Sequence, residues 1–191
     1  MKIEKTELDG VLIITPDVFP DNRGYFFESY NLQKYVNIPR FVQDNESKSV
    51  KGVLRGMHYQ MPPFAQGKLI RIILGKVLDV IVDIRYDSPT FGKHFKIELS
   101  GENKKQLYIP PGFAHGFATL SEEVIFEYKC TNFYNKESKR GIMLNDKDLN
   151  IDWGDINNIT ISDQDKLNKS FKELTEELKL IKSQDWNKIL E

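Results

Sequence analysis

The stretch over residues 68–85 reads KLIRIILGKVLDVIVDIR, and it decides the fold class of this chain. Two dense β-branched runs, Lys68–Leu74 and Val77–Arg85, are separated only by Gly75 and Lys76. β-Branched residues favour strands, and a short glycine-containing connection between two such runs is typical of a β-hairpin. We therefore predict two strands here, paired with each other.

Shorter strand-like runs extend outward from this stretch in both directions. Turns containing glycine or proline interrupt them about every 8–12 residues, and almost no helical period is visible between them. The segments expected to be strands or extended are 11–15, 25–30, 41–49, 53–55, 58–60, 94–99, 107–109, 114–120 and 124–131. This pattern predicts an all-β sandwich or barrel.

Two segments carry helical features instead. Residues 31–36 form a candidate short helix that stops before Pro39. Near the C-terminus, Ser162 precedes Asp165 by three residues, which indicates a possible helix start. Beyond that point apolar side chains recur at helical spacing, namely Phe171, Leu174, Leu178 and Ile181. The chain is therefore expected to end in a helix.

The totals restrict the class of protein. A chain of 191 residues is long enough for one domain with a sizeable core. We predict a single domain over 1–191, with a β core over about 1–160 and a helical segment over about 163–191. The formal net charge of −1 argues against nucleic acid or a membrane surface as a partner. Cys130 is the only cysteine and the N-terminus has no apolar signal core, so we expect a cytoplasmic protein.

The candidate site lies just before the opening stretch, in residues 52–68, GVLRGMHYQMPPFAQGK. This segment brings His58 together with Arg55, Gln60 and Lys68 between glycine and proline turns. Polar groups capable of acid/base work on a rigid β scaffold are what an active site requires. Spacing alone does not decide whether His58 is a hydrogen-bonded strand histidine or a catalytic base. It also does not decide whether Lys68 is an edge lysine whose ammonium reaches solvent or a lysine that stabilises an oxyanion.

Other residues admit both a structural and a functional interpretation. Tyr128 shares a strand face with apolar residues, so it is either a core aromatic or a phenol directed into the barrel as an acid. Asp165 is most simply the helix-capping partner of Ser162. His115 follows a Pro-Pro-Gly turn at a spacing found in metal-binding β-helix proteins, but no His-x-His and no later glutamate complete a metal cage. His94 is predicted to be a solvated strand residue.

Ordered motifs along the chain carry a resemblance to one family. They are Asp21-x-Arg-Gly-x-Phe-x-Glu28, Gln43-x-Asn45, Leu54-Arg-Gly-Met-His-Tyr-Gln60, Gln66-Gly-Lys68, Asp83-Ile-Arg-x-x-Ser-Pro-Thr-Phe-Gly92, Ile109-Pro-x-Gly-x-Ala-His-Gly-Phe117, Tyr128-Lys-Cys-Thr-x-x-Tyr134, Trp153 and Ser162-x-x-Asp165. Together they are far more specific than any one of them. Over roughly residues 1–175 the chain resembles the dTDP-4-dehydrorhamnose 3,5-epimerase family.

This resemblance implies a fold, a reaction and a partner. The family fold is a cupin-like double-stranded β-helix, or jelly roll, here with short helices and a C-terminal helix, and it uses no metal and no cofactor. The implied substrate is a nucleotide sugar, dTDP-4-dehydro-6-deoxy-D-glucose, whose inversion at C3 and C5 gives dTDP-4-dehydro-L-rhamnose for cell-surface polysaccharide. The family is usually homodimeric, so a second copy of the chain is the expected protein partner.

The resemblance also assigns roles. His58 is implied to be the base that removes a proton beside the C4 ketone, and Asp165 to fix its tautomer. Lys68 and Arg55 are implied to stabilise the enolate, and Tyr128 to return a proton from the opposite face. The implied substrate-binding residues are Arg23, Glu28, Gln43, Asn45, Arg55, Gln60, His115 and Tyr134, with some supplied across a dimer by the N-terminal strand.

Three positions depart from the family pattern. Lys139 replaces a usual glutamate, Gln164 replaces a frequent lysine or arginine, and Gly154 replaces a usual proline. The first two border the ligand in relatives, so a single-centre epimerase acting on another nucleotide-linked 4-keto sugar stays open. A metal-dependent cupin enzyme built on two histidines stays open as well, as does a non-catalytic module that binds a sugar nucleotide. The extra segment after Phe171 is expected to serve packing or an oligomer surface.

Overall fold

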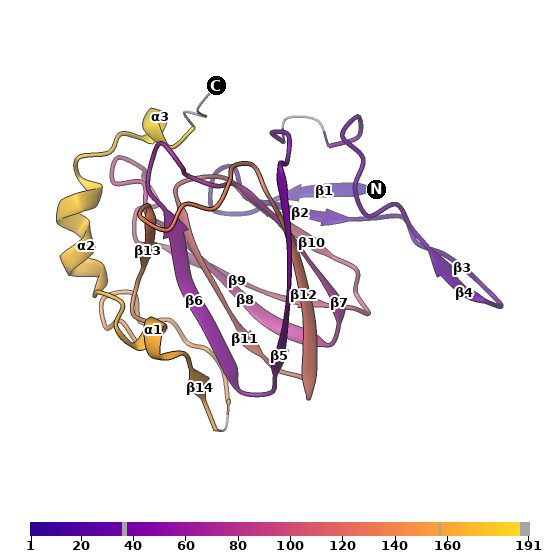
Figure 1. Cartoon of the computed structure of the whole chain (residues 1–191). Helices are drawn as coiled ribbons and strands as arrows, with labels where there is room; N and C mark the ends of the chain where they lie inside the picture. The colour runs from indigo at the N-terminus through magenta and orange to yellow at the C-terminus, as the bar shows by residue number, and fades with distance from the viewer. Residues whose placement is uncertain (36–37, 157, 188–191) are drawn as a thin grey trace.

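The computed structural model describes residues 1–35, 38–156 and 158–187, and two facing antiparallel sheets form its body (Figure 1). One sheet contains, in spatial order, β1 (Lys2–Lys5), β2 (Leu12–Thr15), β10 (Gln106–Ile109), β7 (Lys68–Leu74), β12 (Glu123–Cys130) and β5 (Gln43–Val50). The other contains β13 (Lys139–Gly141), β6 (Val53–Gln60), β11 (Phe113–Thr119), β8 (Lys76–Asp83) and β9 (His94–Ser100), and β14 (Thr160–Ile161) pairs with β6 in parallel. The predicted cupin-like jelly roll is confirmed.

The opening stretch does form two strands, but the prediction that they pair as a hairpin is wrong. β7 pairs with β10 and β12, whereas β8 pairs with β9 and β11 in the other sheet. The chain crosses between the sheets at Gly75, where φ is +81° and an added Cβ would lie 2.1 Å from the carbonyl oxygen of Glu123. Only glycine tolerates both conditions, so this glycine marks a change of sheet instead of a tight turn.

The second sheet is covered on both faces, which explains why its central strand reads as a nearly continuous apolar run. Alternate residues of β8 point in opposite directions. Val77 and Ile81 belong to the core between the two sheets, together with Ile70, Leu107, Phe117 and Phe126. Val80 and Val82 belong to a second core on the outer face, together with Met57, Tyr59, Phe171, Leu174, Leu178 and Trp186.

The N-terminal region differs from two predictions. The strand expected over 25–30 is only β4 (Gly24–Phe26), which pairs with β3 (Phe19–Asp21) in a separate two-stranded hairpin that projects from the body (Figure 1). The helix expected over 31–36 is a turn as far as Tyr35, and Val36 lies outside the described residues. The Asn31 side chain accepts the Gln33 backbone N–H at 3.0 Å, and the Asn31 carbonyl accepts those of Lys34 and Tyr35, so the described residues make a single capped turn.

Among the described C-terminal residues, three short helices, not one, lie along the outer face of β6 and β13 (Figure 1). They are α1 (Asp163–Lys166), α2 (Phe171–Leu178) and α3 (Ser183–Trp186). Ser170 and Glu173 form a capping box at the start of α2, and Trp186, only 1% exposed, packs edge-on against Tyr59. The extra segment therefore serves packing as far as it is described; residues 188–191 lie outside. Within the described ranges, no helix has the length and apolar character to cross a membrane.

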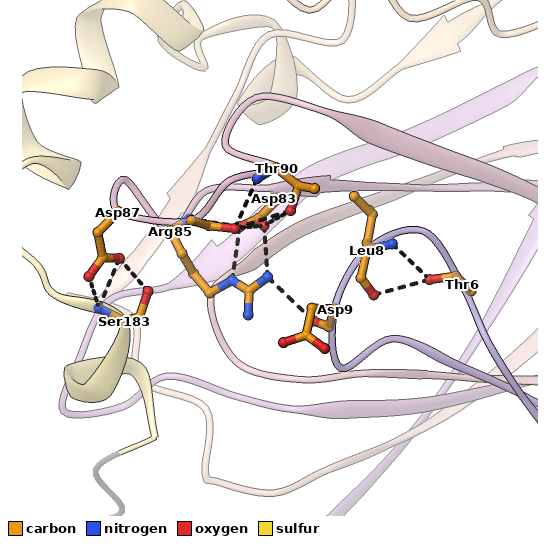
Figure 2. A network of polar contacts seen from close by, with 9 residues as sticks. Thr6, Leu8, Asp9, Asp83, Arg85, Asp87, Thr90 and Ser183 are labelled. Carbon is orange, nitrogen blue, oxygen red and sulfur yellow. Dashed lines mark hydrogen bonds and ion pairs between the residues drawn. The ribbon is translucent and has the colours of Figure 1, made fainter.

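A polar network holds both ends of the chain to the turn after β8 (Figure 2). The fully buried Asp83 accepts hydrogen bonds from the Arg85 guanidinium at 2.7 and 2.9 Å and from Thr90 at 2.6 Å. The same guanidinium donates to the backbone carbonyl of Asp9, and Asp87 accepts from the backbone N–H of Ser183 at the start of α3. Because a buried carboxylate must be paired, this motif is structural.

Candidate active site

A cavity of about 600 Å³ opens between the two sheets. Its size lies within the range of about 300–1,000 Å³ that is usual for small-molecule sites. One wall comes from β6, β11 and β13 and the helix α1, and the other wall comes from β5, β7 and β12. The chemically active side chains that line it are His58, Lys68, His115, Tyr128, Lys139 and Asp165. The cavity therefore gathers residues from segments far apart in the sequence.

His58 and Asp165 form a hydrogen-bonded pair on one wall. Their Nε2 and Oδ1 atoms are 2.5 Å apart, although 107 positions separate them in the chain. His58 reaches the cavity because alternate β6 residues point inward, while Met57 and Tyr59 point to the outer core. Ser162 caps α1 by accepting the Asp165 backbone N–H at 3.1 Å. The capping interpretation thus holds for the backbone of Asp165, and its side chain is left to pair with His58.

The environment keeps this imidazole neutral and this carboxylate charged. Burial lowers the pKa of His58 below its ordinary value, against the hydrogen bond and charge of Asp165, and the charges of Lys139 and Lys68 lower it further. Burial tends to raise the pKa of Asp165, but the interaction with His58, chiefly their hydrogen bond, outweighs it, so this pKa is lowered. A neutral imidazole whose Nε2–H donates to a carboxylate presents Nδ1 as a proton acceptor.

Two glycines let the strands that carry the cavity histidines approach closely. β6 and β11 place His58 directly opposite His115, and the register shifts between His115 and Phe117. An added Cβ at Gly56, where φ is +132°, would lie 2.5 Å from the Cα of Gly116. Any side chain at Gly56 would therefore push the two strands apart and displace the histidine that follows it.

Tyr128 and Lys68 stand on the wall that faces the pair. They come from β12 and β7, and the Lys68 ammonium lies 6.0 Å from the centre of the Tyr128 ring. Burial raises the pKa of Tyr128, so the phenol keeps its proton. Burial also lowers the pKa of Lys68, partly offset by the neighbouring Cys130 and Asp79. This wall therefore offers a protonated phenol beside the amine of a lysine.

A second imidazole–carboxylate pair supports the cavity floor. His115 Nε2 lies 2.9 and 3.1 Å from the two carboxylate oxygens of Asp79, which is fully buried on β8. Asp79 was not among the predicted site residues, although a lone acid inside the apolar run 77–82 was a usable signal. A buried carboxylate needs a partner, and two buried partners hold each other's orientation.

The residues expected to bind substrate divide into three groups. Arg55 and Asn45 line the cavity; the Arg55 guanidinium is held by the Ser49 hydroxyl at 3.0 Å. Gln43 links to Asn45 by a side-chain hydrogen bond of 3.0 Å and accepts the backbone N–H of Tyr134. Asn45, Gln43 and the Tyr134 backbone are thus linked by hydrogen bonds on the β5 side, and Arg55 is anchored separately to the same strand.

Gln60 projects from the same strand face as His58 but lies outside the cavity. It is buried, and its amide donates to the backbone carbonyls of Phe64 and Phe133 while accepting the Asn135 N–H. It does not line the cavity, so in this structure it ties loops together. Arg23 and Glu28 do not line the cavity either. They lie on the projecting hairpin and just after it, respectively.

A metal site built on the two histidines meets a specific obstacle. The Nε2 atoms of His58 and His115 are each engaged by a carboxylate, from Asp165 and Asp79 respectively. Across 1–35, 38–156 and 158–187, no three His, Cys, Asp or Glu side chains group in a way that could hold a metal ion. What the site offers is acid/base chemistry: a neutral imidazole, a neutral phenol and cations around one cavity.

The chain is similar to known enzymes that act on sugar nucleotides. The family model described as dTDP-4-dehydrorhamnose 3,5-epimerase matches residues 5–173. The dTDP-4-dehydrorhamnose 3,5-epimerase of Shigella flexneri is 54% identical over 169 residues, which is 86% of this chain and 93% of that protein.

Solved structures agree. A dTDP-6-deoxy-D-glucose-3,5-epimerase from Legionella pneumophila, in complex with dTDP-4-keto-L-rhamnose, aligns with a TM-score of 0.88 and 46% identity, covering 93% of this chain and 96% of that one. The 3'-monoepimerase ChmJ from Streptomyces bikiniensis, in complex with dTDP-quinovose, aligns with a TM-score of 0.87 and 28% identity, covering 95% and 93%. The likeness extends over the whole cavity-bearing body.

Proposed function

The chain belongs to the dTDP-4-dehydrorhamnose 3,5-epimerase family, and from this premise we propose that it inverts C3 and C5 of dTDP-4-dehydro-6-deoxy-D-glucose to give dTDP-4-dehydro-L-rhamnose. One observation carries the proposal: an imidazole on one sheet and a phenol on the facing sheet line the same cavity. The enzyme is an isomerase, and we place it in the cytoplasm, in line with its single buried cysteine.

The reaction begins with proton removal by His58. The hydrogens at C3 and C5 flank the C4 ketone, so removing either one leaves an enolate whose charge resides largely on O4. Asp165 accepts the Nε2–H of His58 at 2.5 Å, which orients Nδ1 toward the substrate and stabilises the imidazolium that forms. A positioned base of this kind contributes typically about 10²–10⁴ in rate.

The enolate is stabilised by cations that are already in place. Lys68 stands beside Tyr128, and Arg55 is held by Ser49 and by the backbone carbonyl of Lys48. Because their positions are fixed before the reaction, they need little reorganisation when charge develops on O4. Removing one such donor from other enzymes costs roughly 2.7–4 kcal/mol.

Inversion requires the returning proton to come from the other face of the ring. Tyr128 lies on β12, in the sheet opposite β6 and His58, and its raised pKa keeps the phenol protonated. A proton taken by His58 from one face and returned by Tyr128 to the other changes the configuration at that carbon. Proton exchange with solvent then returns His58 to the neutral imidazole and Tyr128 to the neutral phenol, and repetition at the second carbon inverts both centres.

An isotope experiment tests this reaction. The enzyme is incubated in deuterium oxide with dTDP-4-dehydro-6-deoxy-D-glucose, and the product is analysed by NMR and mass spectrometry. Because every inversion replaces the carbon-bound hydrogen with one from a solvent-exchanged group, we expect deuterium at both C3 and C5. Deuterium at one carbon alone would establish a single-centre epimerase, and deuterium at neither would refute the proposal.

The projecting hairpin leads to a second part of the proposal, a homodimer that completes each cavity. Three aromatic side chains on it are exposed, Phe19 by 61%, Tyr25 by 56% and Phe26 by 69%. Exposed apolar patches of this kind mark protein interaction sites. Arg23 lies at the tip of the same hairpin and is not among the residues that line the cavity of its own chain. We propose that the hairpin of one subunit brings Arg23 and Glu28 to the cavity of the other.

Mixing two inactive variants tests the exchange. In a heterodimer of Arg23→Ala with His58→Asn, one cavity would combine an intact His58 with an intact Arg23 from the other subunit. We expect each variant alone to be impaired and an equal, reassorted mixture to recover about a quarter of the wild-type rate, since half of the dimers then hold one complete site. If mixing recovers nothing while native mass spectrometry shows heterodimers, each hairpin serves its own chain.

A further inference from the structure

Lys139 occupies the cavity wall beside the proposed base. It begins β13, the edge strand of its sheet, where it lies directly opposite Gln60, and Gly141 lies opposite His58. Directly opposed residues in an antiparallel pair project from the same face. Since His58 projects into the cavity, so does Lys139, and both belong to its lining. The Lys139 ammonium therefore faces whatever the cavity binds.

This ammonium is not neutralised within the part of the chain that the structure describes. Its neighbour Arg140 pairs with Glu177 at 3.1 Å on the outer side, but the Lys139 side chain forms no hydrogen bond or ion pair there. A half-buried ammonium that faces a cavity without a counter-charge is unfavourable in the empty protein. Such an arrangement becomes favourable when an anion binds.

The other charges of the cavity do not compensate it. Arg55, Lys68 and Lys139 are its cations, whereas Glu46 and Asp165 are its carboxylates. Asp165 is occupied by His58, and Glu46 is exposed to solvent. The charge of Lys139 also lowers the pKa values of both His58 and Lys68. The cavity wall is therefore positive before any substrate arrives.

We infer that the Lys139 ammonium binds the diphosphate of the nucleotide sugar. The inference rests on the proposed function and adds a specific subsite to it. The diphosphate carries its charge throughout the reaction, whereas the enolate oxygen is charged only transiently. Arg55 already donates to Ser49 and Lys48, and Lys68 lies deeper, near Asp79 and Tyr128. Lys139, on the edge strand, is the cation left to meet a permanent anion, so it should govern KM more than kcat.

Calorimetry with two ligands tests the contact without requiring turnover. The dissociation constants of thymidine and of dTDP are measured for the wild type, Lys139→Met, Lys139→Arg and the control Lys147→Met. Lys147 is exposed and lies outside the cavity lining, so its replacement removes the same charge elsewhere. For Lys139→Met we expect dTDP to bind about tenfold more weakly and with a smaller salt dependence, and thymidine to bind unchanged. Lys139→Arg should stay close to the wild type.

An NMR titration of His58 provides an independent readout. The charged groups that face this imidazole are Asp165 from α1, Lys68 from β7 and Lys139 from β13. Removing the lysine charge should raise the pKa of His58 in Lys139→Met and leave it unchanged in Lys147→Met.

Two results would overturn the inference: Lys139→Met behaving like Lys147→Met, or thymidine weakening as much as dTDP. A wild type that binds no dTDP and shows no turnover would instead refute the proposed function, so the two failures are distinguishable.

Discussion

Replacing His58 by Asn is expected to lower kcat/KM by about 10²–10⁴, because the positioned base is lost. The asparagine amide can still donate to the buried Asp165, so the carboxylate is not left unpaired and the fold should persist. Both inversion and deuterium exchange should fall together, since no proton leaves the sugar. Steady-state kinetics and solvent exchange measure the effect, and circular dichroism checks the fold.

The pH dependence of the wild type should identify the same group. The base must be neutral, so activity is lost as the pH falls through the pKa of His58. Burial lowers that pKa below 6.5, so the acid limb of kcat/KM should lie below pH 6.5. Asp165 raises the pKa of His58, and Asp165→Asn should therefore move the limb to still lower pH while reducing the rate.

His94 supplies the control for these measurements. It is a histidine on β9 that does not line the cavity. His94→Asn should keep the wild-type rate and acid limb. An unchanged rate in His58→Asn, or an equal loss in His94→Asn, would contradict the assignment of the base.

Replacing Tyr128 by Phe is expected to separate proton removal from inversion. The ring keeps its place between Phe126 and the Lys68 ammonium, but the proton donor on that face is gone. His58 can still remove a proton and return a solvent-derived one to the same face. We expect deuterium exchange to continue at a measurable rate while the rate of forming the inverted product falls by about 10²–10⁴.

The Tyr128 phenol, as the proton donor, should also determine how activity changes at high pH. A phenol must be protonated to donate, so activity that depends on it is lost as the pH rises through its pKa. Burial raises the pKa of Tyr128 above 10, so this group should not limit the wild type until the pH exceeds 10. Tyr86→Phe, at an exposed tyrosine outside the cavity, is the control. Full inversion by Tyr128→Phe would assign the returning proton to another group.

The predictions that succeeded concern local pattern. The alternation of side chains along residues 124–130 correctly placed Phe126 and Tyr128 on one inward face, because successive side chains of a strand point to opposite faces of the sheet. The spacing of Ser162 and Asp165 correctly indicated a helix start, because the hydroxyl of an N-cap reaches only the next two or three amides. Such features depend on neighbours within one turn or one strand.

The predictions that failed concern features that depend on which segments pack or pair with a segment in space. Residues 68–85 have the pattern of a hairpin because both runs are apolar and Gly75 lies between them. The same sequence is compatible with a crossing between two sheets. The crossing forms because β7 pairs with β10 and β12, whereas β8 pairs with β9 and β11 in the other sheet. The segment that starts at Asn31 has the composition of a short helix and begins with a helix-like capped turn, but the described residues form only that one turn.

The sequence by itself determined the β class of the chain, the inward face of Tyr128, and, through its ordered motifs, the family to which it belongs. Only the tertiary structure decided that His58 meets Asp165, that His115 rests on Asp79, and that the uncompensated Lys139 faces the same cavity. The reason is that period and spacing act over a few residues, whereas these meetings are produced by sheet register and helix docking across up to 107 positions.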